Sequence, residues 1–163
     1  MSDFASLADA GRRLGPALRA AWGDRPDPLL LALIPNGVPV ALGIRETWPV
    51  PVRGLPAARS DEGVVVQPDP EWAGRMVVVV DDGVETGTAA RAAADALRRS
   101  DVAGLVLAVP VCPREALADL QHRYDEVVAL VRPLARRSLA WHYTSFDTVD
   151  ESEARRLLAG LPA

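Results

Sequence analysis

The stretch MVVVVDDGVETGTAARAAADAL, residues 76–97, decides the fold and points to the site. Four valines, residues 77–80, run into Asp81 and Asp82, and a short loop of Gly, Glu and Thr then leads into an alanine-rich segment. An unbroken apolar run of this kind is typical of a strand buried on both faces of a parallel sheet. We therefore expect a strand over 77–80, a loop after it and a helix over 88–100.

The same alternation of strand and helix extends along the chain. Further strands are expected at 29–34, 104–111 and 126–131, and further helices at 5–22, 38–47, 113–124 and 150–160. Asp150 is the expected N-cap of the last helix and Gly160 its stop. Residues 138–146 (SLAWHYTSF) are expected to be extended. Alternating strands and helices predict an α/β fold, with a parallel sheet flanked by helices.

The length of 163 residues predicts a single domain over 1–163, and a hydrophobic content of 49% is enough for a sizeable core. The least regular part is 48–75, where prolines and charges alternate. We expect short strands and a mobile excursion there. No internal repeat and no low-complexity segment is present in the sequence.

Several classes of function are disfavoured by composition. The formal charge of −4 gives no reason to expect a nucleic-acid partner. The apolar runs are too short for a membrane span, the N-terminus lacks the order of a signal peptide, and the lone Cys112 cannot form an intrachain disulfide. A cytoplasmic protein is therefore expected. No lysine is present, which excludes chemistry that needs an amine side chain.

The loop after the 77–80 strand has the composition of a site for a sugar phosphate. Gly83 and Gly87 permit a tight backbone, and the loop N–H groups and the helix N-terminus favour a phosphate. A phosphate alone would not favour two adjacent carboxylates, but vicinal hydroxyls would donate hydrogen bonds to Asp81 and Asp82. A divalent metal would also suit them. The alternative interpretation is that the two acids only cap the turn.

VVVVDDGVETGTA resembles the 5-phosphoribosyl-1-pyrophosphate motif of type I phosphoribosyltransferases: an apolar strand, two acids, three variable residues and Thr-Gly. ALIPNGVPVALGI, around 35–37, is similar to the family's pyrophosphate loop. VLAVPVCP, DEVVALV and SLAWHYTSFDTVDESEARRLL look like the C-terminal half of a branch without an assigned substrate. The resemblance covers most of residues 28–160, whereas 48–75 match poorly. It therefore implies the parallel α/β fold of this family, with a reduced hood, the region over the site to which residues 48–75 would belong.

The resemblance implies roles for individual residues. Asp81 and Asp82 would hold the ribose hydroxyls and contact Mg²⁺ indirectly, through the ribose or water. The phosphate would lie against Gly83, Val84, Glu85, Thr86, Gly87 and Thr88, and the pyrophosphate against Pro35, Asn36 and Gly37. In the family a peptide bond in this second loop is often cis and non-proline. Glu85 would be a general base, with an exposed loop acid as its alternative. Family members commonly dimerise, which implies a homodimer.

The chain departs from the family pattern around the leaving group. The family often has Arg or Lys where Asn36 stands, and often a second hydroxyl where Ala89 stands. Many members also bring a Lys or Arg on a mobile loop, whereas the cations near 48–75 here are Arg53, Arg59 and Arg75, and an arginine in such a segment is more often a solvated surface residue. Losing one preorganised stabiliser can cost on the order of 10²–10³ in rate.

Trp141 is the candidate for stacking on the acceptor base, with a core or edge aromatic as its alternative. His122 and His142 lack partners at metal-ligand spacing and are expected to be surface or packing residues, and Cys112 is expected to be buried and inert.

Two functions remain open. One is Mg²⁺-dependent phosphoribosyl transfer to a nucleobase-like or other nitrogen acceptor. The other is a binding or regulatory protein that recognises a nucleoside monophosphate or phosphoribosyl pyrophosphate without turnover, which Asn36, Ala89 and the absence of lysine favour. A phosphate-accepting receiver domain is set aside because the acid pair lies mid-chain and lysine is absent. Neither GxxxxGK[ST] nor GxGxxG is present.

Overall fold

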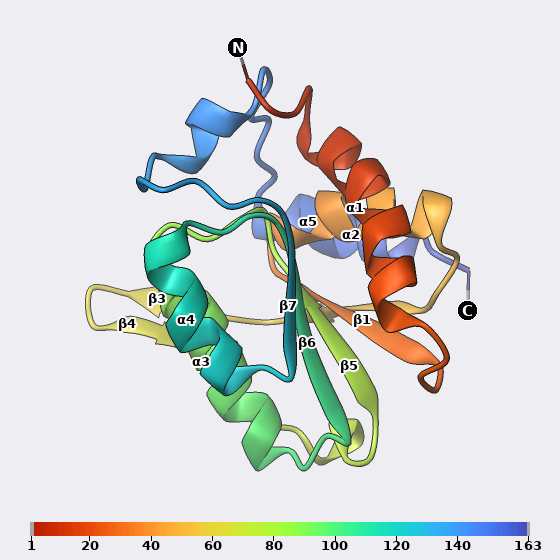
Figure 1. Ribbon diagram of the computed structural model, residues 1–163. Coiled ribbons are helices and arrows are strands. Elements are labelled where there is room, and N and C mark those ends of the chain that lie inside the picture. The colour runs from red at the N-terminus through yellow and green to blue at the C-terminus, as the bar shows by residue number, and fades with distance from the viewer. Residues whose placement is uncertain (1, 163) are drawn as a thin grey trace.

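A computed structural model describes residues 2–162 of the chain (Figure 1). Its centre is a five-stranded parallel sheet in the order β2-β1-β5-β6-β7. The strands are β1 (Pro28–Leu33), β2 (Val52–Leu55), β5 (Met76–Val80), β6 (Gly104–Val111) and β7 (Glu126–Val131). The predicted parallel α/β sheet is therefore confirmed.

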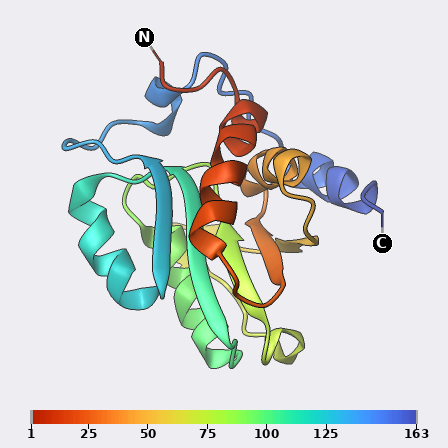
Figure 2. The ribbon, with the colours of Figure 1, turned by 45° about the vertical axis from the view of Figure 1, so that its right-hand side comes forward.

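Helices cover both faces of the sheet (Figures 1 and 2). One face packs against α1 (Leu7–Trp22), α2 (Gly37–Thr47) and α5 (Glu151–Ala159), and the other packs against α3 (Thr88–Arg99) and α4 (Arg114–Arg123). No helix within residues 2–162 is long and apolar enough to cross a membrane.

Successive residues of β5 enter different cores because side chains alternate across a strand. Val78 and Val80 pack with α1 and α2, whereas Val77 and Val79 pack with α3 and α4. All four valines have no exposed surface. This two-sided burial explains why the strand reads as an unbroken apolar run.

Segment 48–75 forms the short strands expected of it. β2 adds to the edge of the main sheet beside β1. β3 (Ala58–Ser60) and β4 (Gly63–Val65) make a separate antiparallel hairpin, and a 3₁₀ turn, η1 (Pro70–Trp72), leads towards β5. The hairpin lies close to α3, and its residues Arg59 and Val64 line the same cavity as Asp81 and Asp82.

The ends of the helices follow from their caps. α1 begins at Leu7 rather than at residue 5 because the hydroxyl of Ser6 accepts a hydrogen bond from the N–H of Asp9. The expected N-cap Asp150 is confirmed, since its side chain accepts from the N–H of Glu153, and Gly160 follows the last residue of α5.

The expectation of an extended 138–146 is wrong for its first half. Leu139–His142 form a 3₁₀ turn, η2, and the chain becomes extended only at Tyr143, which forms an isolated bridge with Phe4. The cause is tertiary: hydrogen bonds to Glu85 and to the N-terminal residues fix the backbone of this segment. Local sequence carries no sign of either contact.

The candidate site lies at the point of the sheet where the strand order reverses, between β1 and β5. β1 has β2 on one side and β5 on the other, and the loops that follow β1 and β5 lead to helices on opposite faces. Ligands of open α/β sheets bind in the crevice that such a switch point leaves at the carboxyl ends of the strands.

Candidate functional site

The two acids at the end of β5 are nearly enclosed. Asp81 and Asp82 are 9% and 8% exposed, and the N–H of Asp82 donates to Oδ1 of Asp81 at 2.9 Å. Burial raises the pKa of Asp81. Burial, and then the adjacent charge of Asp81, raise the pKa of Asp82 well above its ordinary value. Carboxylates held so poorly solvated are suited to accepting hydrogen bonds from a ligand.

The next residues form a loop that exposes backbone N–H groups. Gly83 has φ 145° and Gly87, the N-cap of α3, has φ 88°, both in the region that favours glycine. The N–H of Val84 donates to the carbonyl of Val111 at 2.8 Å, which anchors the loop to β6. Gly87 gives α3 no side-chain cap, so the first N–H groups of the helix are available to an anion.

Hydroxyl and guanidinium groups lie on the two sides of this loop. The hydroxyls of Thr86 and Thr88 are 3.0 Å apart, and Nη1 of Arg91 donates to the carbonyl of Thr86 at 3.1 Å. Arg91 therefore holds the loop from outside the cavity, while the threonine hydroxyls remain beside it.

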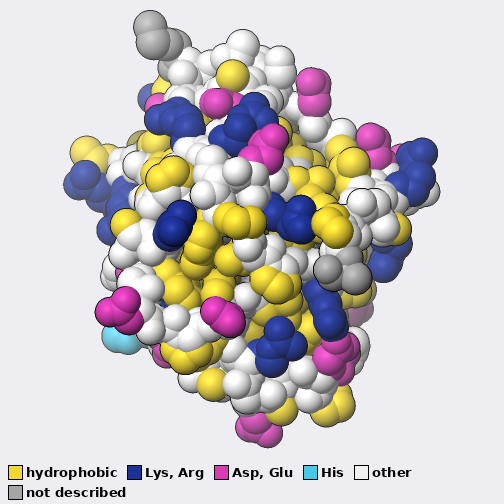
Figure 3. Space-filling model, turned by 90° about the vertical axis from the view of Figure 1, so that its right-hand side faces the viewer, with side chains coloured by type: hydrophobic (Ala, Val, Ile, Leu, Met, Phe, Trp, Pro, Cys, Tyr) yellow, Lys and Arg dark blue, Asp and Glu magenta, His cyan; other side chains and the backbone are white. Residues whose placement is uncertain are grey.

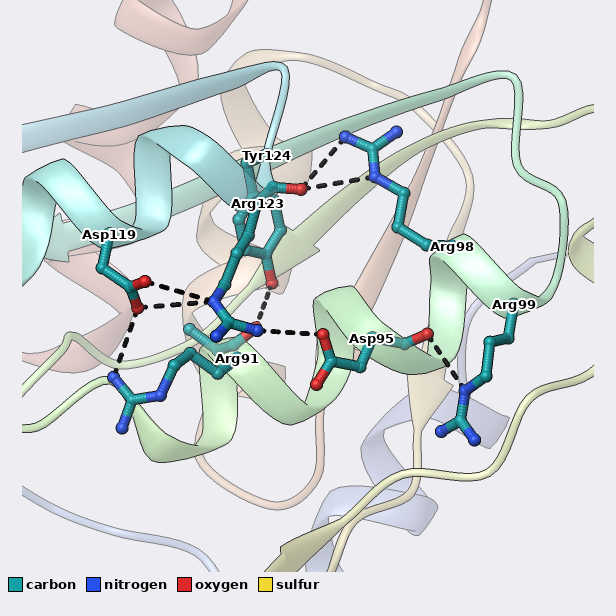
Figure 4. A network of polar contacts seen from close by, with 8 residues as sticks. Arg91, Asp95, Arg98, Arg99, Asp119, Arg123 and Tyr124 are labelled. Atoms are coloured by element: carbon teal, nitrogen blue, oxygen red, sulfur yellow. Dashed lines mark hydrogen bonds and ion pairs between the residues drawn. The ribbon is translucent and has the colours of Figure 1, made fainter.

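A network of polar contacts ties α3 to α4 (Figure 4). Arg123 of α4 reaches Asp95 of α3 at 3.0 Å and pairs with Asp119 of its own helix at 3.4 Å, and the hydroxyl of Tyr124 donates to the carbonyl of Ala90 at 2.7 Å. Because the ion-paired side chains are partly exposed, these pairs contribute little to stability and mainly set how α3 and α4 lie against each other.

The 35–37 loop comes close to the acids because residue 37 is glycine. A Cβ at Gly37 would clash with the carbonyl oxygen of Val80. The side chain of Asn36 holds the segment before α5, because its Oδ1 accepts a hydrogen bond from the N–H of Val149 at 3.0 Å. The cis peptide bond joins Ile34 to Pro35, so it is a proline bond one position before the loop in which the resemblance implied a non-proline one.

One cavity of about 370 Å³ collects most of the predicted site residues. They are Pro35, Asn36, Asp81, Asp82, Gly83, Val84, Glu85, Thr86, Gly87 and Thr88. Gly37 and Trp141 do not line it. The wall also includes Arg59, Val64, Ala89 and Leu139, of which Val64 and Leu139 were not singled out in the sequence.

Of the three arginines considered for the site, Arg59 lines the cavity. It lies on β3 of the hairpin, and its positive charge lowers the pKa values of Asp81 and Asp82 against the larger effect of burial. Arg53 instead pairs with Glu71 and lies 6.0 Å from the centre of the Trp72 ring. Arg75 directly precedes β5, at the end of the strand opposite the acids.

The C-terminal segment closes one side of the cavity. The N–H of Leu139 donates to Oε1 of Glu85 at 2.7 Å, and Leu139 Cδ2 lies 2.5 Å from the position a Cβ would take on Gly83. Trp141 is 49% exposed, outside the cavity wall, with Arg137 4.4 Å above its ring.

The remaining candidates take structural positions. His142 is a packing residue, as expected: it is buried, and its Nδ1 lies 2.7 Å from Oδ2 of Asp3. Cys112 is buried, and burial raises the pKa of its thiol to about 11, which keeps it protonated and unreactive.

Within residues 2–162 there is no group of three or more His, Cys, Asp or Glu side chains that could hold a metal ion. The pair Asp81–Asp82 instead fits a magnesium ion that is held only partly by the protein. Mg²⁺ usually keeps several waters and is held by one or two carboxylates together with the phosphates of a substrate. The residues present thus suit an ion that arrives with its ligand.

Comparisons with known proteins bear on the fold of the chain. No protein-family model matches the chain. Proteins of Mycobacterium tuberculosis strains CDC 1551 and H37Rv, provisionally named phosphoribosyl transferases, are 36% identical over 80 residues, which is 49% of this chain and 18% of each relative. The chain thus matches less than a fifth of the length of these curated relatives.

Solved structures match over almost the whole chain. A protein of Thermus thermophilus superposes with a TM-score of 0.83 at 24% identity, covering 97% of this chain and 98% of that one. A Neisseria gonorrhoeae protein with bound ppGpp gives 0.59 at 15% identity, covering 94% and 91%. The purine phosphoribosyltransferase of Pyrococcus horikoshii gives 0.55 at 15% identity, covering 83% and 96%. The expected resemblance is confirmed, and the chain has the fold of the type I phosphoribosyltransferases.

Proposed function

We propose that this chain binds 5-phosphoribosyl-1-pyrophosphate with Mg²⁺ and transfers its phosphoribosyl group to a nitrogen acceptor, such as a nucleobase. The observation that carries the proposal is that Asp81 and Asp82 share one cavity with the 83–88 loop and with Asn36 of the second loop. Paired carboxylates, uncapped helix amides and a second loop are what ribose hydroxyls, a 5-phosphate and a pyrophosphate require.

In the bound state the ribose 2- and 3-hydroxyls donate to Asp81 and Asp82, and the loop amides of 83–88 donate to the 5-phosphate. Ribose hydroxyls or a nearby cation would restore the solvation that burial removes from the two carboxylates. Bound Mg²⁺ would neutralise part of the pyrophosphate charge. The acceptor nitrogen forms a bond to C1 as the C1–O bond to pyrophosphate breaks, and the electron pair of that bond leaves with the pyrophosphate.

We assign Arg59 to the leaving group. No lysine is present in the sequence, and the side chain of Asn36 is neutral and bonded to Val149. Arg59 lines the same cavity as Pro35 and Asn36, so its permanent positive charge supports a role at the pyrophosphate end. A guanidinium there would stabilise the negative charge that develops as pyrophosphate departs.

We assign Glu85 to the acceptor. Its Oε1 is bonded to the N–H of Leu139, so the carboxylate is oriented beside the cavity wall. From there it would take the proton that a ring nitrogen loses on forming the new bond. Trp141 would reach the acceptor only after a change in the 138–146 segment, because it lies outside the wall and Leu139 is the residue of η2 that faces the cavity.

The second candidate is a protein that binds a nucleoside monophosphate or phosphoribosyl pyrophosphate without turnover. Asn36 favours it, because this side chain serves the fold rather than the leaving group. Ala89 favours it too, since it lines the cavity without offering a hydroxyl. This candidate requires the same ribose-phosphate contacts, so the two differ only at the pyrophosphate end.

We further propose that residues 1–163 act as one phosphoribosyltransferase-like domain in the cytoplasm, and that it forms a homodimer. The face formed by α1, α2 and α5 would be the dimer contact. Figure 3 shows hydrophobic side chains across the middle of this face, with arginines among them. Self-association would bury these apolar groups.

Calorimetric titration with phosphoribosyl pyrophosphate, with and without Mg²⁺, tests the proposal, with ribose 5-phosphate and nucleoside monophosphates titrated in parallel. The proposal expects binding of phosphoribosyl pyrophosphate that is tight only with Mg²⁺, and release of pyrophosphate when a nucleobase is added, which the second candidate does not expect. Binding of the monophosphates alone would favour the second candidate. Binding of none of these ligands would remove both functions.

A further inference from the structure

The N-terminal residues pair with a segment that precedes α5, and this segment reaches the acid pair. Residues 2–5 lie along residues 142–145, and we call these two segments the terminal clasp (Figures 1 and 2). The N–H of Phe4 donates to the carbonyl of His142 at 2.9 Å, and the N–H of Thr144 donates to the carbonyl of Phe4 at 2.8 Å. Between them the Asp3–His142 pair adds a contact of 2.7 Å.

Tyr143 projects from the clasp towards the acids. Its ring lies 5.5 Å from that of Phe4 and 5.2 Å from that of Phe146, and only 5% of the residue is exposed. Its hydroxyl donates a 2.7 Å hydrogen bond to the backbone carbonyl of Asp82. The aromatic contacts on both sides leave this hydroxyl little freedom to point elsewhere.

The carbonyl that Tyr143 holds belongs to the peptide between Asp82 and Gly83. On one side of this peptide are the paired carboxylates, and on the other is the loop that begins at Gly83 with φ 145°. The loop is anchored again at Val84, through the carbonyl of Val111. Fixing this one peptide therefore fixes the distance between the carboxylates and the loop amides. A ribose 5-phosphate needs this spacing, because its hydroxyls and its phosphate bind the two groups at the same time.

We propose that Tyr143 is a positioning residue of the ribose-phosphate site, and that the terminal clasp sets the affinity of the site through its hydroxyl. The link to affinity rests on the proposed function. Tyr143 does not line the cavity and acts on the site through the backbone of Asp82. The N-terminal residues thereby contribute to a site from which they are remote in sequence.

Tyr124 supplies a matched control. Its hydroxyl is also buried, and it also donates to a backbone carbonyl at 2.7 Å, that of Ala90. Ala90 lies within α3, where helical hydrogen bonds already hold the backbone, whereas Asp82 lies outside any helix or strand. Replacing either tyrosine with phenylalanine therefore removes one hydroxyl-to-carbonyl hydrogen bond. Tyr143→Phe removes it from a loop peptide, and Tyr124→Phe removes it from a peptide that helical hydrogen bonds also hold.

The experiment measures both variants and the wild-type chain by ribose 5-phosphate titration and by amide hydrogen exchange across residues 83–88. Tyr143→Phe should weaken ribose 5-phosphate binding and accelerate loop exchange by about five-fold each, the equivalent of one neutral hydrogen bond. Tyr124→Phe should leave both unchanged although it lowers the unfolding temperature similarly. Phe4→Ala keeps the Tyr143 hydroxyl but removes an aromatic ring that packs against Tyr143. It should also weaken ribose 5-phosphate binding and accelerate loop exchange.

Equal exchange and equal binding in the two Tyr→Phe variants would overturn the proposal. If the wild-type chain binds neither ribose 5-phosphate nor phosphoribosyl pyrophosphate, the proposed function fails on its own, and the exchange measurement still decides whether Tyr143 positions the loop. Faster exchange only in Tyr143→Phe would then support the positioning role.

Discussion

The backbone N–H of Leu139 donates a 2.7 Å hydrogen bond to Oε1 of Glu85, so the acid of the phosphate loop also holds the C-terminal segment against the cavity. This contact joins residues 54 positions apart. It gives Glu85 a structural task in addition to the proton transfer proposed for it.

Two substitutions of Glu85 separate these tasks. Glu85→Gln keeps an oxygen that can accept from Leu139 but cannot take a proton, whereas Glu85→Ala removes both properties. We expect amide exchange at Leu139 to stay slow in Glu85→Gln and to accelerate about five-fold in Glu85→Ala. Unchanged exchange in Glu85→Ala would show that the bond does not hold the segment in solution.

The acid pair predicts an unusual pH dependence of stability. The folded-state pKa values of Asp81 and Asp82 are raised, while the unfolded chain ionises near the ordinary value of about 3.9. Between these values the folded state binds more protons, so the pair's contribution to the unfolding free energy falls as pH rises. Asp81→Asn with Asp82→Asn should therefore unfold at a higher temperature than wild type at pH 7, with the gap closing towards pH 4. Thermal unfolding across this range measures it, and a gap that widens on acidification would contradict it.

Loss of the Arg59 side chain should weaken binding at the pyrophosphate end of the ligand more than at the 5-phosphate end. Arg59→Ala removes the cation beside the pyrophosphate loop, so the affinity for phosphoribosyl pyrophosphate should fall by on the order of 10- to 100-fold, and that for ribose 5-phosphate much less. Arg53→Ala is the control, because Arg53 is paired with Glu71 away from the cavity wall. Equal losses in the two variants, measured by calorimetry, would remove Arg59 from the leaving-group role.

Gly83 should tolerate no side chain while Leu139 is in place. Gly83→Ala adds backbone strain at φ 145° and a contact of 2.5 Å with Leu139, whereas Gly63→Ala, at φ 123°, adds strain with no atom within 4 Å. We expect Gly63→Ala to cost roughly 1–2 kcal/mol of unfolding free energy and Gly83→Ala distinctly more. Adding Leu139→Ala to Gly83→Ala should relieve the clash. Denaturant unfolding tests the series, and equal costs in the two single variants would place Leu139 elsewhere in solution.

The sheet and the acid pair could be predicted from sequence because both depend on local patterns. The valines 77–80 are buried on two faces, so their pattern reports the strand directly, and the acids follow at the carboxyl end of that strand. Ligand sites of parallel sheets lie at such ends, which made the 81–88 loop a candidate without any tertiary information.

The rest of the site depends on contacts that sequence does not display. Leu139 and Tyr143 reach the loop through hydrogen bonds to Glu85 and Asp82, and no local pattern distinguishes them from core residues. Asn36 was recognised as a departure, but its bond to Val149 spans 113 positions. Arg59 was named as one cation among three, and only the placement of the hairpin beside α3 separates it from the others.

The central claim is that the end of β5 and the loop after it bind a ribose phosphate. The most direct measurement is calorimetric titration of ribose 5-phosphate into three proteins: the wild type, Asp81→Asn with Asp82→Asn, and Asp24→Asn with Asp27→Asn, which makes the same change in charge at an exposed turn before β1. We expect binding to the wild type and to the turn variant, and none to the Asp81 and Asp82 variant while its fold remains intact. Equal binding to all three proteins would contradict it.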